Sequence, residues 1–130
     1  MPLLGFTVFK DKILDGSKKQ TIRKLRKIPI KKGDKLYLYW KLRTKQCEKL
    51  FETICIDEFK IIFHKWVNDL QCYRVNKNTP YFFTDKECEQ LAILDGFEDY
   101  SEMTGMLYNA HKEYFFGNPF QVIRWESIEE

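Results

Sequence analysis

The chain has 130 residues, of which 44% are hydrophobic and 16% aromatic. A chain of this length can bury roughly two-thirds of its unfolded surface, which suits one domain with one core and leaves too little for two independent domains. The aromatic content argues against disorder. No apolar run reaches the ~18 residues of a membrane helix, and Lys10 and Asp11 interrupt the N-terminal apolar stretch. We therefore expect a single domain over residues 1–130 that is cytoplasmic and does not bind a membrane.

The net charge of +3 hides an uneven distribution along the chain. Residues 10–49 carry 15 Lys or Arg and 4 acidic residues, a net charge of +11, which leaves 7 basic and 15 acidic residues in the remainder, a net charge of −8. A concentrated positive field attracts polyanions, because each neutralised phosphate releases condensed counterions. This distribution favours RNA or a nucleotide as partner. Two alternatives are a solvated basic face, and a basic half neutralised by the acidic half across the fold.

The cysteines and histidines do not indicate a metal site or a cofactor. None of the four cysteines belongs to a CxxC pair, and a core of this size does not need disulfides. We expect them to be reduced and mostly buried: Cys47, Cys55, Cys72 and Cys88. Because His64 and His111 stand at no ligand-like spacing from these cysteines, zinc is the weaker alternative.

The first third of the chain predicts one strand, one helical turn and a long connection. Residues 5–9 have the composition of a strand, and residues 10–14 that of a helical turn that Gly16 can end in a left-handed conformation. Residues 24–32 contain repeated Lys and Arg around Pro29, which predicts an extended, exposed connection.

The middle of the chain predicts an antiparallel sheet. Residues 36–40 alternate with period two, and both faces of that strand are apolar or aromatic. Residues 51–56 and 59–66 are two further strand-forming runs, and residues 71–75 can pair with the second across a turn at residues 68–69.

The last third predicts two helices and a closing strand. Thr84 and Glu87 form a capping box at the start of a helix that Gly96 ends. One face of this helix carries Cys88, Leu91, Ala92 and Asp95. A second box that begins at Asp99 opens another helix. Its expected buried stripe is Met103, Met106, Leu107 and Ala110. Residues 120–125 predict the final strand.

Three separated stretches carry a resemblance to a known family. They are GSKKQTIR at residues 16–23, GDKLYLY at residues 33–39, and AILDGF at residues 92–97 followed by Glu102. Their order and spacing resemble those of the ASCH family, and LRTKQC at residues 42–47 looks like the version in a bacterial and phage branch. The resemblance covers about residues 6–125.

The resemblance implies both a fold and a class of ligand. ASCH domains are similar to PUA domains, in which a small mixed β-barrel is flanked by helices, so the implied fold is a single α+β domain of PUA-like type. The family is linked to RNA binding and RNA metabolism. The leading hypothesis is therefore recognition of RNA or a modified nucleoside through a basic cleft, which agrees with the charge distribution.

The centre of the expected site is the segment at residues 16–23. Lys18 and Thr21 follow a glycine in a loop that enters a strand, where a cation, a hydroxyl and free N–H groups can meet a phosphate or an oxyanion. In an extended chain Arg23 points to the same face as Thr21, and Ile22 points into the core. Aromatic and guanidinium planes further along can stack on bases, although such aromatics are often core residues. The expected nucleic-acid-binding residues are Lys18, Lys19, Arg23, Lys24, Arg26, Tyr39, Trp40, Arg43 and Lys45.

Catalysis is the alternative to binding alone. Some ASCH proteins resemble amidohydrolases that remove the acetyl group of N4-acetylcytidine with a Lys, a Thr and a carboxylate, which the motifs match to Lys18, Thr21 and Asp95. The carboxylate position is Glu in the best-matching hydrolases. A Thr hydroxyl needs activation by a neighbouring amine, and a carboxylate can orient groups or relay the proton. A ribonuclease, and a protein-interaction module on the acidic residues 50–130, are further alternatives.

Overall fold

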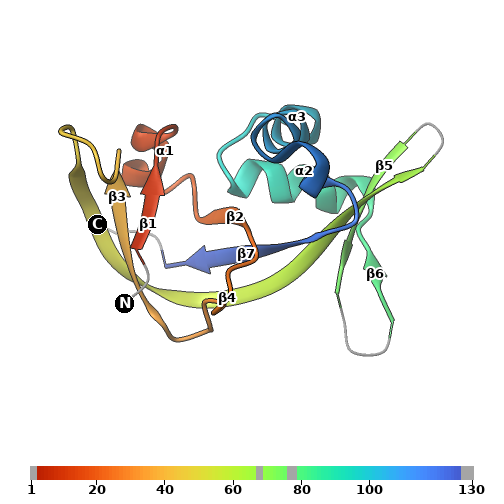
Figure 1. Cartoon of the computed structure of the whole chain (residues 1–130), viewed down its shortest axis with the longest axis horizontal. Coiled ribbons are helices and arrows are strands. Elements are labelled where there is room, and N and C mark those ends of the chain that lie inside the picture. The colour runs from red at the N-terminus through yellow and green to blue at the C-terminus, as the bar shows by residue number, and fades with distance from the viewer. Residues whose placement is uncertain (1–2, 67–68, 76–78, 127–130) are drawn as a thin grey trace.

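The computed structural model describes residues 3–66, 69–75 and 79–126 and has a mixed α+β architecture (Figure 1). In chain order the elements are β1 (Leu3–Phe6), α1 (Lys10–Asp15), β2 (Gln20–Lys24), β3 (Lys35–Trp40), β4 (Glu48–Trp66), β5 (Asp69–Arg74), β6 (Tyr81–Phe82), α2 (Asp85–Leu94), α3 (Tyr100–His111), the short 3-10 helix η1 (Lys112–Phe115) and β7 (Pro119–Trp125). None of the described helices has the length and apolar character needed to cross a bilayer.

The seven strands form one open, mixed sheet built around β4. The first part of β4 pairs with β3, its middle with β7 and its end with β5, all antiparallel. Outside these pairs, β1 runs parallel to β3, β2 runs antiparallel to β7, and β6 extends β5. In Figure 1, α2 and α3 cover the part of the sheet that holds β2 and β7, and α1 lies beside β1 and β3.

β4 is one continuous strand, where the sequence predicts two. Residues 51–56 and 59–66 both belong to it, and the register against β7 shifts between Cys55 and Asp57. An extra residue at a bulge bends a strand without ending it, which is why the polar residues 57–58 do not form a loop. The predicted turn at residues 68–69 lies partly outside the described residues, and Asp69 already pairs with Trp66.

The N-terminal strand begins and ends earlier than residues 5–9 predict. Pairing with β3 selects Leu3–Phe6, and Phe9 has a left-handed backbone with φ 66° before α1. A non-glycine residue in this region is held there only by its surroundings. The helical turn itself and its end at Gly16, which has φ 87°, are as predicted.

Helix α2 has the predicted cap, and the helix face expected to carry Cys88, Leu91, Ala92 and Asp95 is buried. The Thr84 hydroxyl accepts from the Glu87 N–H at 3.2 Å, and the Glu87 carboxylate accepts from the Thr84 N–H at 2.9 Å. Such a reciprocal pair satisfies two of the N–H groups that a helix start leaves free.

Helix α3 differs from its prediction in two respects. Asp99 accepts from the Glu102 N–H at 2.8 Å, but the Glu102 carboxylate accepts from the N–H of Glu98, so the second box is not reciprocal. Met103 is fully buried, whereas Met106 is 41% exposed and Ala110 is also exposed. Of the apolar stripe predicted to be buried, the first residue, Met103, therefore packs in the core, and the later residues line a cleft described below.

Two hydrophobic clusters share the sheet. The larger lies between the sheet and α2 and α3, and its centre is Phe63, whose ring stacks on Phe115 at 4.6 Å and meets Phe120 edge-on at 5.7 Å. The smaller lies beside α1 and includes Leu36 and Trp125. All four cysteines are free thiols, and all but Cys47 are buried, as predicted.

Candidate functional site

The segment at residues 16–19 is fixed between α1 and the C-terminal end of α2. The Lys18 N–H donates to the Lys12 carbonyl, and the Lys19 N–H donates to the Leu94 carbonyl, each at 2.9 Å. Gly96, with φ 102°, ends α2 where a Cβ would lie 3.1 Å from the Phe9 ring. A left-handed turn with no side chain is needed here, so the motif glycine sets the distance between α2 and the loop before α1.

Lys18 and Asp95 form a buried ion pair at this junction. The Lys18 ammonium is 3% exposed, lies 3.4 Å from Asp95 Oδ2 and donates to the Asp95 carbonyl at 2.6 Å. Its Nζ also stands 5.6 Å from the ring centres of Phe6 and Phe9. A cation at the C-terminal end of a helix is favoured by the exposed carbonyls there, so part of the role of Lys18 is to cap α2.

The Asp95 carboxylate is only partly satisfied. Asp95 is 6% exposed, and its Oδ1 has no hydrogen-bond partner among the residues that the structure describes. Burial raises the pKa of the Asp95 carboxyl, and the nearby Lys18 charge only partly offsets this rise. Burial also lowers the pKa of the Lys18 ammonium, and the Asp95 charge only partly offsets that decrease. Burial therefore drives both members of the pair towards their neutral forms.

Thr21 and Arg23 lie on one face of β2, as predicted. Arg23 Nε donates to the Thr21 hydroxyl at 3.2 Å, Arg23 Nη2 donates to the Gly5 carbonyl at 2.6 Å, and the guanidinium lies 4.8 Å from the Phe6 ring centre. Burial lowers the pKa of Arg23 to about 10. Arg23 thus holds β2 against β1, and within the described residues the Thr21 hydroxyl has no acceptor for its own proton.

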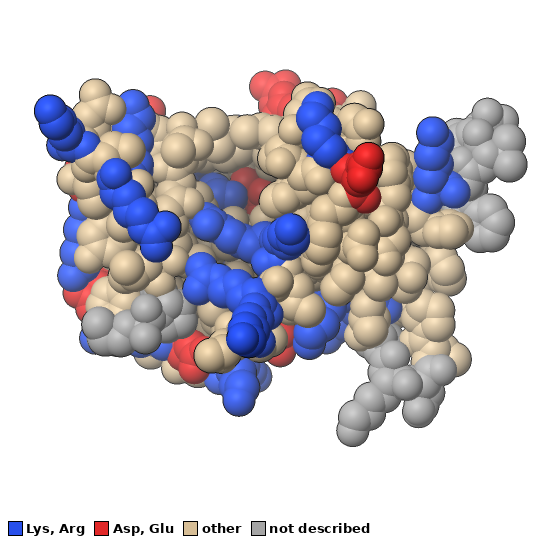
Figure 2. Space-filling view, viewed as in Figure 1, with Lys and Arg blue, Asp and Glu red and all other residues tan. Residues whose placement is uncertain are grey.

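One cleft of about 450 Å³ is lined by Lys18, Thr21, Arg23 and Asp95. Its walls are the β1–α1 connection, β2 and one side of α3, and Figure 2 shows a hollow on this face with Lys and Arg side chains around it. Hydrophobic side chains from both clusters contribute, including Phe6 and Phe97. The volume lies within the ~300–1,000 Å³ typical of small-ligand pockets, and it is too small for a duplex.

The other residues predicted to bind nucleic acid fall into two groups. Lys24 and Arg26 line the cleft with Lys18 and Arg23. Outside it are Lys19, which is exposed, and a group on the β3–β4 side of the molecule: Tyr39, Trp40, Arg43 and Lys45. The Trp40 ring already has the ammonium groups of Lys10 and Lys41 within 6 Å of its centre. The structure thus brings the catalytic candidates together but separates the aromatic candidates from them.

Several lining residues were not expected. Phe97, Met106, Ala110 and His111 complete the wall opposite β2. Burial lowers the pKa of His111, with a smaller contribution from Lys24. The spacing of the three α3 residues places them on one helix face, a pattern that equally describes a core stripe. Whether these residues pack in the core or line a cleft depends on the position of α3 relative to β2, which the sequence does not give.

The described residues include no group of three or more His, Cys, Asp or Glu that could hold a metal ion.

Comparison of the chain with protein-family models, with curated proteins and with solved structures finds no match in any of the three. The chemistry of the cleft is therefore the basis for assigning a function.

Proposed function

We propose that this chain is an ASCH-type domain with a PUA-like sheet that takes one base of RNA, or one modified nucleoside, into the cleft between β1, β2 and α3. The observation that carries the proposal is the Lys18–Asp95 pair at the cleft, with one carboxylate oxygen unpartnered among the described residues. An unsatisfied buried acceptor costs about 1–3 kcal/mol. A ligand that enters far enough to donate a hydrogen bond to Oδ1, which the present side-chain positions bury, offsets that cost. Exocyclic amines and ring N–H groups of bases are such donors.

The surroundings of the pair favour a flat, partly charged ligand. Phe6 and Phe97 supply apolar surface for a planar ring. Lys24 is exposed and Arg26 half-buried at the cleft, so their charges can reach the phosphates on either side of an inserted base. A cytoplasmic location is part of the proposal, because the four cysteines are free thiols.

A cleft-filling substitution tests this proposal. Ala110→Phe places a ring in the cleft, whereas Asn109→Phe adds the same ring to the next position of α3, which does not line it. Both positions are exposed, so neither change disturbs the core. We expect Ala110→Phe to weaken binding of N4-acetylcytidine and of single-stranded RNA by about tenfold or more in calorimetric titrations, which is about 1.4 kcal/mol. Asn109→Phe should leave the affinity within about twofold of the parent.

Salt dependence separates base insertion from nonspecific attraction. Lys24→Ala should lower the slope of log affinity against log salt by about 1 for RNA and leave affinity for the uncharged nucleoside unchanged. Absence of binding to every probe at low salt, or equal effects of the two phenylalanine substitutions, would contradict the proposal.

Amide hydrolysis is a second candidate, favoured by the Thr21 hydroxyl. Its oxygen accepts from Arg23 while its proton has no acceptor within the described residues, and burial lowers the pKa of the nearby Lys18. In this reaction Thr21 Oγ1 attacks the acetyl carbonyl, and a neutral Lys18 amine takes the hydroxyl proton and returns it to N4 of the leaving cytidine. Water then releases acetate from Thr21. Asp95, although shorter than the family Glu, still contacts Lys18.

Incubation with N4-acetylcytidine decides between the two candidates. If the cleft is catalytic, chromatography shows cytidine accumulating with the parent protein and with Thr21→Ser, and no turnover with Thr21→Val, which keeps the side-chain shape without the hydroxyl. Asp95→Glu restores the family carboxylate and should raise the rate. No cytidine from the parent or from Asp95→Glu at high protein concentration rules out hydrolysis of this substrate and leaves binding alone.

A further inference from the structure

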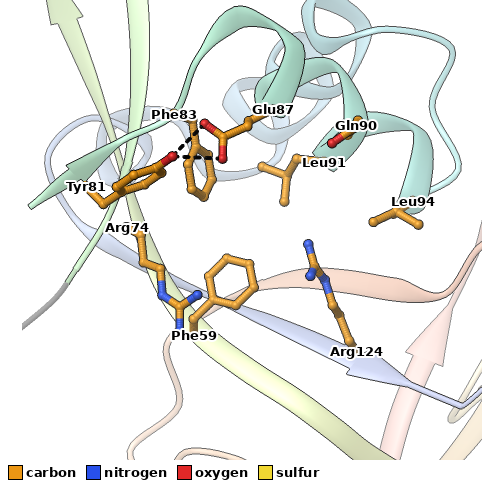
Figure 3. A pocket seen from close by; sticks show the side chains of 9 residues that line it. All are labelled: Phe59, Arg74, Tyr81, Phe83, Glu87, Gln90, Leu91, Leu94 and Arg124. Atoms are coloured by element: carbon orange, nitrogen blue, oxygen red, sulfur yellow. Dashed lines mark hydrogen bonds between the residues drawn. The ribbon is translucent and has the colours of Figure 1, made fainter.

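A second cavity lies along α2 and shares no lining residue with the cleft, which meets only the C-terminal end of that helix. Its volume is about 490 Å³, and Figure 3 shows the side chains around it. Phe59 of β4 lies on one side of it, and α2 closes the other side with Gln90, Leu91 and Leu94. The cavity therefore has the size and the apolar wall of a small-ligand pocket.

Two arginines from different strands lie beside the same aromatic ring in this cavity. The guanidinium carbons of Arg74 on β5 and Arg124 on β7 are 4.5 Å and 5.0 Å from the Phe59 ring centre. Neither arginine has a carboxylate within ion-pair distance among the described residues. They are also the only arginines in residues 50–130, which are otherwise acidic.

The two guanidinium groups retain most of their donors. Arg124 Nε donates to the Gln20 amide oxygen at 3.0 Å, which fixes the direction of that side chain, while its terminal nitrogens have no partner among the residues described. No hydrogen bond is formed by Arg74 to the described part of the chain, and its contact is with the Phe59 ring. Burial lowers the pKa of Arg124, Asp57 counteracts this, and Arg74 adds to the lowering. Figure 3 shows the two guanidinium groups on either side of the Phe59 ring. Two partly desolvated, mutually repelling cations favour an anion that can contact both of them.

The opposite end of the cavity carries a fixed negative charge. Glu87 accepts a hydrogen bond from the Thr84 N–H, and each of its carboxylate oxygens lies 3.1 Å from the Tyr81 hydroxyl. Dashed lines in Figure 3 mark the two contacts with Tyr81. These contacts, led by the one from Thr84, lower the pKa of Glu87 and keep it ionised. A ligand that fits both ends has an anionic group near the arginines and hydrogen-bond donors near Glu87 and Gln90.

We propose that this cavity binds an organic phosphate monoester with a flat, amine-bearing ring, the chemistry of a purine nucleoside monophosphate. The phosphate lies at the edge of the Phe59 ring that faces the cavity, where the guanidinium forks of Arg74 and Arg124 can reach it from the two sides of the ring. The ring lies along Phe83, Leu91 and Leu94, and its exocyclic amine faces Glu87. This site is separate from the base-binding cleft and does not depend on the function proposed for that cleft.

Adenosine 5′-monophosphate and adenosine are the probes for this site, titrated into the full chain by calorimetry. We expect the monophosphate to bind about tenfold more tightly than adenosine, and Arg74→Gln to remove this difference. Arg74→Gln is the informative change, because Arg74 makes no hydrogen bond within the described residues and contacts the Phe59 ring instead, so we expect the variant to keep the fold. Lys65→Gln removes one charge from an exposed position of β4 outside the cavity and should leave both affinities within about twofold.

Two further experiments test which cavity holds the phosphate and whether that phosphate belongs to a free nucleotide or to the end of an RNA. Ala110→Phe fills the first cleft and should leave monophosphate binding unchanged, so a loss would place the ligand in that cleft and overturn the proposal. Equal binding of monophosphate and adenosine, or equal effects of Arg74→Gln and Lys65→Gln, would also overturn it. An RNA oligonucleotide with a 5′-phosphate, compared with one without, shows whether the same chemistry is met by an RNA end as well as by the free nucleotide.

Discussion

Replacing Lys18 by methionine is expected to lower the free energy of unfolding by about 3–5 kcal/mol at pH 7, because it leaves the Asp95 carboxylate buried without its cation. Asp95 is 6% exposed and Lys18 is its nearest charge. Methionine has a similar length and no charge, so the loss comes from the missing ammonium more than from the missing volume. Urea denaturation followed by tryptophan fluorescence measures the effect.

The pH dependence identifies the cause of this loss. In the Lys18→Met variant the largest influence that lowers the pKa of Asp95 is absent, so that pKa rises further above its ordinary value. The folded variant then holds a proton that the unfolded chain has released, and its stability falls as the pH rises through the folded pKa. Lowering the pH through that pKa should therefore recover much of the lost stability.

Two variants control this experiment. The double variant Lys18→Met, Asp95→Leu should regain much of the loss, because no unpaired charge remains. Lys10→Met removes the cation of the exposed pair with Glu48 and should cost below about 1 kcal/mol. If Lys18→Met and Lys10→Met have equal effects at every pH, Lys18 and Asp95 do not form a buried pair.

Phe63→Ala is expected to cost about 3–5 kcal/mol of unfolding free energy, the range for removing a buried aromatic side chain. The Phe63 ring is completely buried, stacks on Phe115 and meets Phe120 edge-on. Its carbonyl accepts from the Gly117 N–H at 2.9 Å, so the same residue joins β4 to the segment after η1. Thermal and urea unfolding of the variant measure the loss.

Phe116→Ala is the matched control for this prediction. Phe116 also contacts Phe115 edge-on, at 5.0 Å, but it is 38% exposed. Burial of part of a ring contributes in proportion to the area removed from water, so we expect a loss of about 1 kcal/mol. A loss for Phe63→Ala no larger than that for Phe116→Ala would show that Phe63 is not at the centre of the larger cluster.

Local patterns predicted those parts of the fold that depend on neighbouring residues. The reciprocal cap between Thr84 and Glu87 needs only a few residues in sequence, and so do the left-handed turns at Gly16 and Gly96. The limits of β1 could not be predicted in the same way, because pairing with β3 selects Leu3–Phe6 and leaves Phe9 to begin α1. β6 was missed for the same reason, since two residues carry no period of their own.

The candidate site was predicted as a set of residues but not as a set of contacts. Lys18, Thr21, Arg23 and Asp95 all line the cleft. The sequence does not show that Arg23 donates to the Thr21 hydroxyl, because the Gly5 carbonyl and the Phe6 ring of β1 set the direction of the Arg23 guanidinium. The bond from Lys18 to the Asp95 carbonyl depends on where the end of α2 lies against the loop before β2. The second cavity was missed entirely, and its one signal in the sequence was the isolated pair Arg74 and Arg124 in an acidic half.

The continuous course of β4 has a consequence for how the chain folds. β4 and β7 each supply residues to both hydrophobic clusters, so neither cluster can lose its strands while the other stays intact. The two clusters should therefore melt in one cooperative transition. Because their central pairing joins Phe59 to Val122, far apart along the chain, loop closure must come before most of the stabilising contacts. Folding times of about milliseconds to seconds are expected for such non-local pairing.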